Sequence, residues 1–96
     1  MIFDEPSFDV EWLDAQLPTE LSPEKNLLLA VLLDAINTAY SRVAIKKRAH
    51  DEARLWILSR ATDGLFCFVQ ICEALSLDVN ATRRAIVHTR GWKEAA

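Results

Sequence analysis

One segment near the end of the chain carries side chains whose types and spacing suit the reading of DNA. Arginine can form two hydrogen bonds to guanine, asparagine can form two to adenine, and histidine can reach a base edge or a phosphate. If residues 79–90 form a helix, its outward side displays Asn80, Arg83, Arg84, Val87 and His88. We expect these residues to contact DNA, and we expect Arg90, farther along, to add a contact to the phosphate backbone.

The opposite side of the same predicted helix suits a buried core. Its residues recur at the i, i+3, i+4, i+7 spacing, namely Thr82, Ala85, Ile86 and Thr89. Asp78 directly precedes the helix and is a good N-cap residue. Residues 68–75 form a short amphipathic segment before it, and residues 76–78 lie between the two as a tight turn. Two helices joined in this way, the second of them basic, predict a helix-turn-helix over about residues 66–90.

These residues also resemble known proteins. Ile71-Cys72-Glu73-Ala74-Leu75-Ser76-Leu77 followed by Ala81-Thr82-Arg83 is similar to the helix-turn-helix of sigma-factor region 4 and related bacterial regulators. The stretch from Leu27 to Ile86 also resembles small bacterial proteins of unknown function, through Phe66-Cys67-Phe68, Ile71 to Leu75, Leu77-Asp78 and Arg83-Arg84. The first resemblance implies DNA binding and transcriptional regulation. The second implies a fold rather than an activity.

Three positions of this sequence depart from the pattern of those regulators. Ser76 stands where the turn usually has glycine, so a left-handed backbone there is less comfortable. Thr82 stands where a branched aliphatic residue is usual, which weakens the packing between the two helices. Val79 replaces a proline of the first turn. A helix-turn-helix with these changes is also compatible with a scaffold that no longer binds DNA.

Charge is distributed unevenly along the chain. Residues 1–24 contain seven acidic residues and no basic one, a net charge of −7, whereas residues 25–96 contain seven acidic and eleven basic residues, a net charge of +4. The basic part suits a polyanion, with Lys46, Lys47, Arg48 and Lys93 as further contacts to the DNA backbone. The acidic head either keeps the protein soluble or folds over the basic helix and competes with DNA. The sequence pI of about 5.3 opposes DNA binding, because the neutralisation of phosphates supplies much of the affinity.

No enzymatic motif appears among the remaining reactive residues. Cys67 and Cys72 lie five residues apart on one predicted helix, and no second Cys or His pair completes a zinc site, so we expect buried thiols. His50 precedes two acidic residues on a charged stretch and is expected to be solvated. The sequence has no glycine-rich phosphate loop and no nucleophile elbow. We therefore predict a protein that is not an enzyme and binds no cofactor or metal.

Helices must position these residues. The chain has only two glycines and three prolines, and none lies between residues 24 and 63, which favours helix over sheet. Ninety-six residues suffice for one small core. We predict an all-α protein, a small helical bundle with a C-terminal helix-turn-helix. Residues 1–22 form an acidic N-terminal segment with a short helix, and residues 23–96 form the helical domain.

The longest helix is predicted to begin at Ser22-Pro23-Glu24, which combines a cap, a first-turn proline and an acid. Residues 27–33 are apolar on all sides, so we expect this part to be buried on all sides, either centrally or in a homodimer formed through Leu27–Tyr40. A polar stripe then follows at Asp34, Asn37, Thr38 and Ser41. We expect a break near residues 45–50 and a further helix over about residues 49–59, with Ala53, Trp56 and Ile57 facing inward.

The N-terminal segment is predicted to form one short helix over Ser7–Leu13. Ser7 caps this helix, and Phe8 and Trp12 lie one turn apart on one face. These aromatic rings dock either on their own domain or on a protein partner.

The acidic start of the chain is unlike a signal peptide. The longest apolar run of the whole sequence is far shorter than the roughly 20 residues that span a bilayer. We expect a cytoplasmic protein without membrane contact, either a DNA-binding regulator or a protein-interaction module on a similar scaffold, such as an adaptor, an inhibitor or a phage-type accessory factor.

Overall fold

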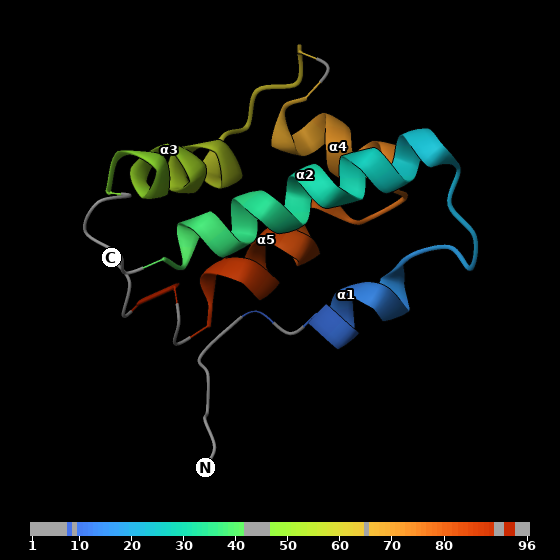
Figure 1. The fold of residues 1–96 in the computed structure, drawn as a ribbon, viewed down its shortest axis with the longest axis horizontal. Coiled ribbons are helices and arrows are strands. Elements are labelled where there is room, and N and C mark those ends of the chain that lie inside the picture. Colours follow the sequence, from blue (N-terminus) through green and yellow to red (C-terminus); the bar gives the residue numbers. More distant parts are fainter. Residues whose placement is uncertain (1–7, 9, 42–46, 65, 90–91, 94–96) are drawn as a thin grey trace.

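The computed structural model describes residues 8, 10–41, 47–64, 66–89 and 92–93. Its described part is all-helical, without a strand, which confirms the predicted all-α class. The five helices are α1 (Val10–Gln16), α2 (Pro23–Ala39), α3 (Lys47–Leu58), α4 (Phe68–Ala74) and α5 (Val79–Val87). In Figure 1, α2 crosses the middle of the molecule, with α3 and α4 drawn on one side of it and α1 and α5 on the other.

A single hydrophobic core joins all five helices. Each helix contributes at least one fully buried apolar side chain to it, including Leu13, Ile36, Ile57, Phe68 and Ile86. The rings of Trp56 and Phe68 meet edge to face with centroids 5.6 Å apart, an arrangement that aromatic pairs favour. The core therefore holds α4 and α5 in place against α2 and α3.

Helix α2 begins as its sequence predicts. Ser22 is the N-cap, its hydroxyl accepts a hydrogen bond from the Lys25 amide at 3.2 Å, and Pro23 occupies the first turn. The predicted stripe in the second half is also confirmed, because Ile36 and Ala39 are buried while the side chains of Asp34 and Asn37 are exposed.

The first half of α2 corrects an expectation. Residues 27–33 are not buried on all sides, because Leu27 is 60% exposed and Ala30 is also exposed. A domain this small has too few helices to cover both sides of α2 along its length. The homodimer predicted through Leu27–Tyr40 stays a prediction.

The N-terminal helix lies later than predicted. Helix α1 begins at Val10, and Phe8 precedes it, while the predicted cap at Ser7 falls outside the described residues. Phe8 is buried, and its ring meets the Trp12 ring edge to face at 6.4 Å. These rings dock on their own domain, as one alternative predicted. The other alternative, a partner bound through the Phe8/Trp12 segment, stays a prediction, and Phe8 itself is part of the core.

The chain leaves α2 earlier than the predicted break at residues 45–50. Helix α2 ends at Ala39, whose carbonyl oxygen accepts a hydrogen bond from Arg54 Nε at 3.2 Å. The Tyr40 hydroxyl next to it lies 2.7 Å from the Ile86 carbonyl oxygen and donates to it. Long-range partners of this kind end the helix where the local sequence has no breaker. In α3, Ile57 is buried and Ala53 and Trp56 are half-buried, as predicted.

Candidate functional site

A tight turn joins α4 to α5. The Leu77 amide donates to the Cys72 carbonyl at 2.8 Å and the Ser76 amide donates to the Glu73 carbonyl at 3.1 Å. This pair of hydrogen bonds closes a Schellman motif, which requires a left-handed residue after the end of the helix. Ser76 adopts that conformation with φ 63°. The serine therefore occupies the position where glycine would be favoured.

Helix α5 is capped and packed as its sequence predicts. Asp78 is the N-cap, and its Oδ1 accepts a hydrogen bond from the Ala81 amide at 2.8 Å. Thr82 and Ile86 are buried against the core and Ala85 is half-buried. The Thr82 hydroxyl is buried without a hydrogen-bond partner, which is the cost of a threonine where an aliphatic side chain is usual.

Arg83 corrects the predicted outward face of α5. Its side chain is buried, and its guanidinium donates from Nε to the Ile57 carbonyl at 2.9 Å and from Nη2 to the Ser59 carbonyl at 2.8 Å. The guanidinium also lies 5.0 Å from the centre of the Phe68 ring. Burial and the nearby charge of Arg60 lower its pKa. Arg83 therefore ties α5 to the end of α3 and does not project outward.

The other residues predicted to contact DNA lie either on α5 or among the residues expected to contact the DNA backbone. Asn80, Arg84 and His88 are exposed on α5 and Val87 is half-buried, whereas Arg90 lies outside the described residues. Among the expected backbone contacts, Lys47 forms an ion pair with Asp51 at 3.0 Å and Arg48 with Glu52 at 3.3 Å. Lys93 is exposed, and Lys46 lies outside the described residues. The structure thus leaves three exposed polar side chains together on α5.

His50 is buried, which corrects the expectation of a solvated histidine. Its Nε2 accepts a hydrogen bond from Arg54 Nε at 2.9 Å, so Nδ1 carries the proton that is donated to Asp51 Oδ1 at 3.1 Å. The Arg54 guanidinium stacks 3.9 Å from the centre of the Trp92 ring and donates to the Trp92 carbonyl. Burial lowers the pKa of Arg54. Both ring nitrogens of His50 are therefore engaged in this structural network.

The two cysteines differ in their surroundings. Cys72 is fully buried, and burial raises the pKa of its thiol to about 12. Cys67 is half-buried at the start of α4, so the expectation of buried thiols is met for Cys72 alone. Within the described ranges, no group of three or more His, Cys, Asp or Glu side chains could hold a metal ion. None of the described helices is long and apolar enough to cross a membrane.

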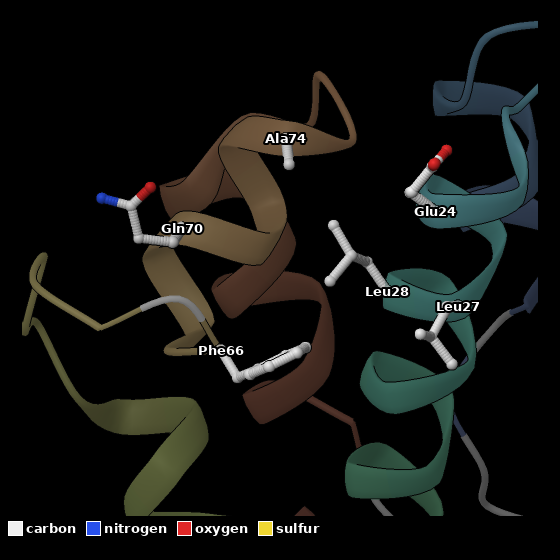
Figure 2. Close-up of a pocket in the computed structure, with 6 residues that line it drawn as sticks. All are labelled: Glu24, Leu27, Leu28, Phe66, Gln70 and Ala74. Carbon is white, nitrogen blue, oxygen red and sulfur yellow. The ribbon is translucent and has the colours of Figure 1, made fainter.

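An apolar groove lies between the start of α2 and α4. Its volume is about 360 Å³, and its lining comprises Glu24, Leu27, Leu28, Phe66, Gln70 and Ala74. Figure 2 shows Leu28 pointing from α2 toward α4, Phe66 closing one end, and the Gln70 amide turned away from the space. The Gln70 amide donates to the Thr62 carbonyl instead. Glu24 is the only charged residue among the described residues of the lining.

Sequence reasoning missed this groove, although one signal for it was present. The all-round apolar run at residues 27–33 indicated more hydrophobic surface than a helix on one side of a bundle can bury. In the structure Leu27 is 60% exposed and Phe66 is 50% exposed. Comparison with family models, with curated proteins and with solved structures finds no match to the chain. The resemblance to sigma-factor region 4 stays a prediction.

Proposed function

We propose that the chain is a non-enzymatic protein-interaction module that binds a partner in the groove between α2 and α4. The observation that carries this proposal is the pairing of two large exposed apolar side chains, Leu27 and Phe66, around one concave apolar space. Single exposed leucines are common in soluble proteins, but a concave surface lined by several apolar residues marks a binding site. Partner side chains placed there gain roughly 25 cal/mol for each Å² of apolar surface removed from water.

The surroundings of the residues that were predicted to contact DNA favour a protein-interaction module over DNA binding. Arg83, one of the arginines predicted to contact DNA, is used inside the molecule. Lys47 and Arg48 each have an acidic partner one turn away on α3. The net charge of the whole chain is −3, which repels a polyanion.

The experiment compares capture of proteins from the source cells on immobilised wild-type chain and on two variants. Leu27→Glu places a charge in the groove without touching the core. Val10→Glu makes the same kind of change at an exposed apolar residue of α1, outside the groove. We expect a partner that is retained by wild type and Val10→Glu, lost from Leu27→Glu, and reproduced by titration with the purified partner. Retention of the same partner by Leu27→Glu would contradict the proposal.

DNA binding through the exposed side of α5 is the second candidate. Its support is the set of exposed polar residues on a capped helix, Asn80, Arg84 and His88, within the helix-turn-helix predicted over about residues 66–90. The test is fluorescence anisotropy with a mixed-sequence duplex at low and physiological salt. Binding that weakens with salt and is lost in Arg84→Ala, but not in the control Arg60→Ala at an exposed arginine outside the predicted contacts, supports this candidate. No binding at low salt ends it.

A separate experiment tests whether the acidic head competes with DNA for the basic helix. If the head competes with DNA, removing its negative charge raises the affinity at low salt. Deleting residues 1–20 is a poor test, because Phe8 and Leu13 belong to the core. Exchanging the exposed acids Asp14, Glu20 and Glu24 for their amides changes only charge. Unchanged DNA affinity in that variant would exclude competition by these three acids.

A further inference from the structure

The side of α3 that faces away from the core carries a second apolar surface. Leu55 is 70% exposed and Leu58 is 47% exposed, and the two lie three residues apart, so they are neighbours on one face of the helix. The core side of α3 is marked by buried His50 and Ile57. Arg60 follows two residues after Leu58 and is also exposed. We name Leu55, Leu58 and Arg60 the α3 ridge.

The charges of the α3 ridge and of the groove are complementary. Glu24 is exposed at the groove and has no ion-pair partner among the described residues, and the same holds for Arg60 on the ridge. Each surface thus combines two or more exposed apolar side chains with one unneutralised charge, and the two charges are opposite. A contact between them would remove apolar surface from water at both sites and would pair both charges.

We propose that the groove of one molecule receives the α3 ridge of a second copy, with Leu55 and Leu58 against Leu27 and Phe66, and Arg60 against Glu24. This inference rests on the proposed function of the groove as a protein-binding site. Figure 1 shows α3 beside the C-terminal half of α2, whereas Glu24 and Leu27 of the groove stand on the first turns of α2. The end of α3 reaches the edge of the groove through Trp56, which donates to the Phe66 carbonyl at 2.9 Å, while Leu55 lies on the side of α3 away from the core.

The contact is heterologous, because the groove and the α3 ridge are different surfaces of the same chain. Each bound molecule keeps one free groove or one free ridge, so association continues beyond a dimer as the concentration rises. The contact buries few side chains compared with a stable interface of roughly 1,200–2,000 Å², so we expect a weak association, roughly micromolar to millimolar.

Sedimentation velocity over a wide range of concentration tests the proposal with two single variants. Leu27→Glu disables the groove and keeps the ridge, whereas Leu55→Glu disables the ridge and keeps the groove. We expect the mass of wild type to rise with concentration, and each variant alone to stay monomeric. A one-to-one mixture of the two variants should form dimers and nothing larger, because only one intact groove and one intact ridge remain to pair. Val10→Glu is the control and should behave as wild type.

A charge exchange tests the pairing of Arg60 with Glu24. Glu24→Arg alone should weaken the association at least tenfold, and the double variant Glu24→Arg with Arg60→Glu should restore it. All these positions are exposed, and unchanged circular dichroism and melting temperature will verify that the variants fold.

Three results would overturn the inference: wild type that stays monomeric at every concentration, association that persists in both single variants, and a mixture of the two variants that stays monomeric. The proposed function can survive each of them. A monomeric wild type whose captured partner is lost in Leu27→Glu shows that the groove binds another protein. A monomeric wild type without any groove-dependent partner refutes both.

Discussion

At the scale of single residues, Arg83 is expected to matter for stability rather than for contact with a ligand. Replacing it by methionine keeps most of the stem but leaves the carbonyls of Ile57 and Ser59 without their donors. Hydrogen bonds to charged groups contribute about 1.5–3 kcal/mol each, so we expect Arg83→Met to lower the free energy of unfolding by about 3 kcal/mol. Urea unfolding followed by circular dichroism measures this change.

The neighbouring arginine provides the matched control. Arg84 is exposed on the same helix, so Arg84→Met should change the free energy of unfolding by less than about 0.5 kcal/mol. The sequence alone placed both arginines on the outward side of the helix, where neither substitution should affect stability. Equal, small effects of the two methionine variants would restore that view and contradict the buried role of Arg83.

The two thiols should react at very different rates. With a pKa of about 12, roughly one Cys72 thiol in ten thousand is ionised at a pH of about 8, and the side chain is also shielded from reagent. We expect a maleimide to label Cys67 in the folded protein and Cys72 only after unfolding in urea, as counted by mass spectrometry. Labelling of the Cys67→Ser variant at the wild-type rate would show that Cys72 is accessible in the folded protein.

Residue identity and spacing predicted the apolar positions of α5 and missed the environment of Arg83. The helical period places Arg83 between buried Thr82 and exposed Arg84, so it lies at the boundary of the two faces. Its long stem lets the guanidinium reach carbonyls 24 and 26 residues away in the sequence. The burial of His50 was missed although its partners Asp51 and Arg54 are close in the sequence, because Arg54 is itself held by the carbonyls of Ala39 and Trp92, 15 and 38 residues away. Partners that are distant in the sequence leave no local periodic signal.

At the scale of elements, the turn between α4 and α5 carries a strain that one substitution should relieve. Ser76 holds φ at 63°, a conformation that costs a residue with a Cβ atom about 1–2 kcal/mol and costs glycine little. After allowing for the greater freedom of glycine in the unfolded chain, we expect Ser76→Gly to raise the free energy of unfolding by roughly 0.5–1 kcal/mol. Thermal and urea unfolding both report this change.

The control for this prediction puts glycine where the backbone is helical. Glu73 is exposed on α4, so Glu73→Gly should lower the free energy of unfolding by about 1 kcal/mol. Because both variants add the same freedom to the unfolded chain, the opposite signs isolate the effect of the left-handed turn. A loss of stability in both variants would show that the Ser76 side chain contributes more than its backbone strain costs.

Elements with strong local signals were predicted closely, and elements that depend on distant contacts were displaced. Helix α2 starts at the predicted cap, and the turn at Ser76 and the cap at Asp78 are where the sequence placed them. The end of α2 was predicted too late, because its stop comes from Arg54 and Tyr40 rather than from glycine or proline. The groove was missed because it forms only when Phe66 and α4 come to lie beside α2.

At the scale of the whole molecule, the sequence separated an acidic segment, residues 1–22, from a helical domain, while the structure gives both one core. Phe8 and Leu13 are buried in the same cluster as Ile36 and Ile86. Charge composition suggested a boundary because acidic residues gather in this segment, but the described ones, Glu11, Asp14 and Glu20, lie at exposed positions. Leu13 packs into the core and Trp12 and Leu17 pack against it, while Val10 stays exposed.

The variant Phe8→Ala tests whether α1 and the other helices unfold as one unit. Removing a buried phenylalanine leaves a cavity, so we expect the free energy of unfolding to fall by about 3 kcal/mol, with one transition that coincides by circular dichroism and tryptophan fluorescence. Val10→Ala, at an exposed position of α1, should change it by less than about 0.5 kcal/mol. If instead Phe8→Ala alters the fluorescence of the folded protein but leaves the transition in circular dichroism unmoved, residues 8–16 undock independently. The boundary near residue 22 would then divide two units that unfold separately, and the acidic segment would be free to act apart from the helical domain.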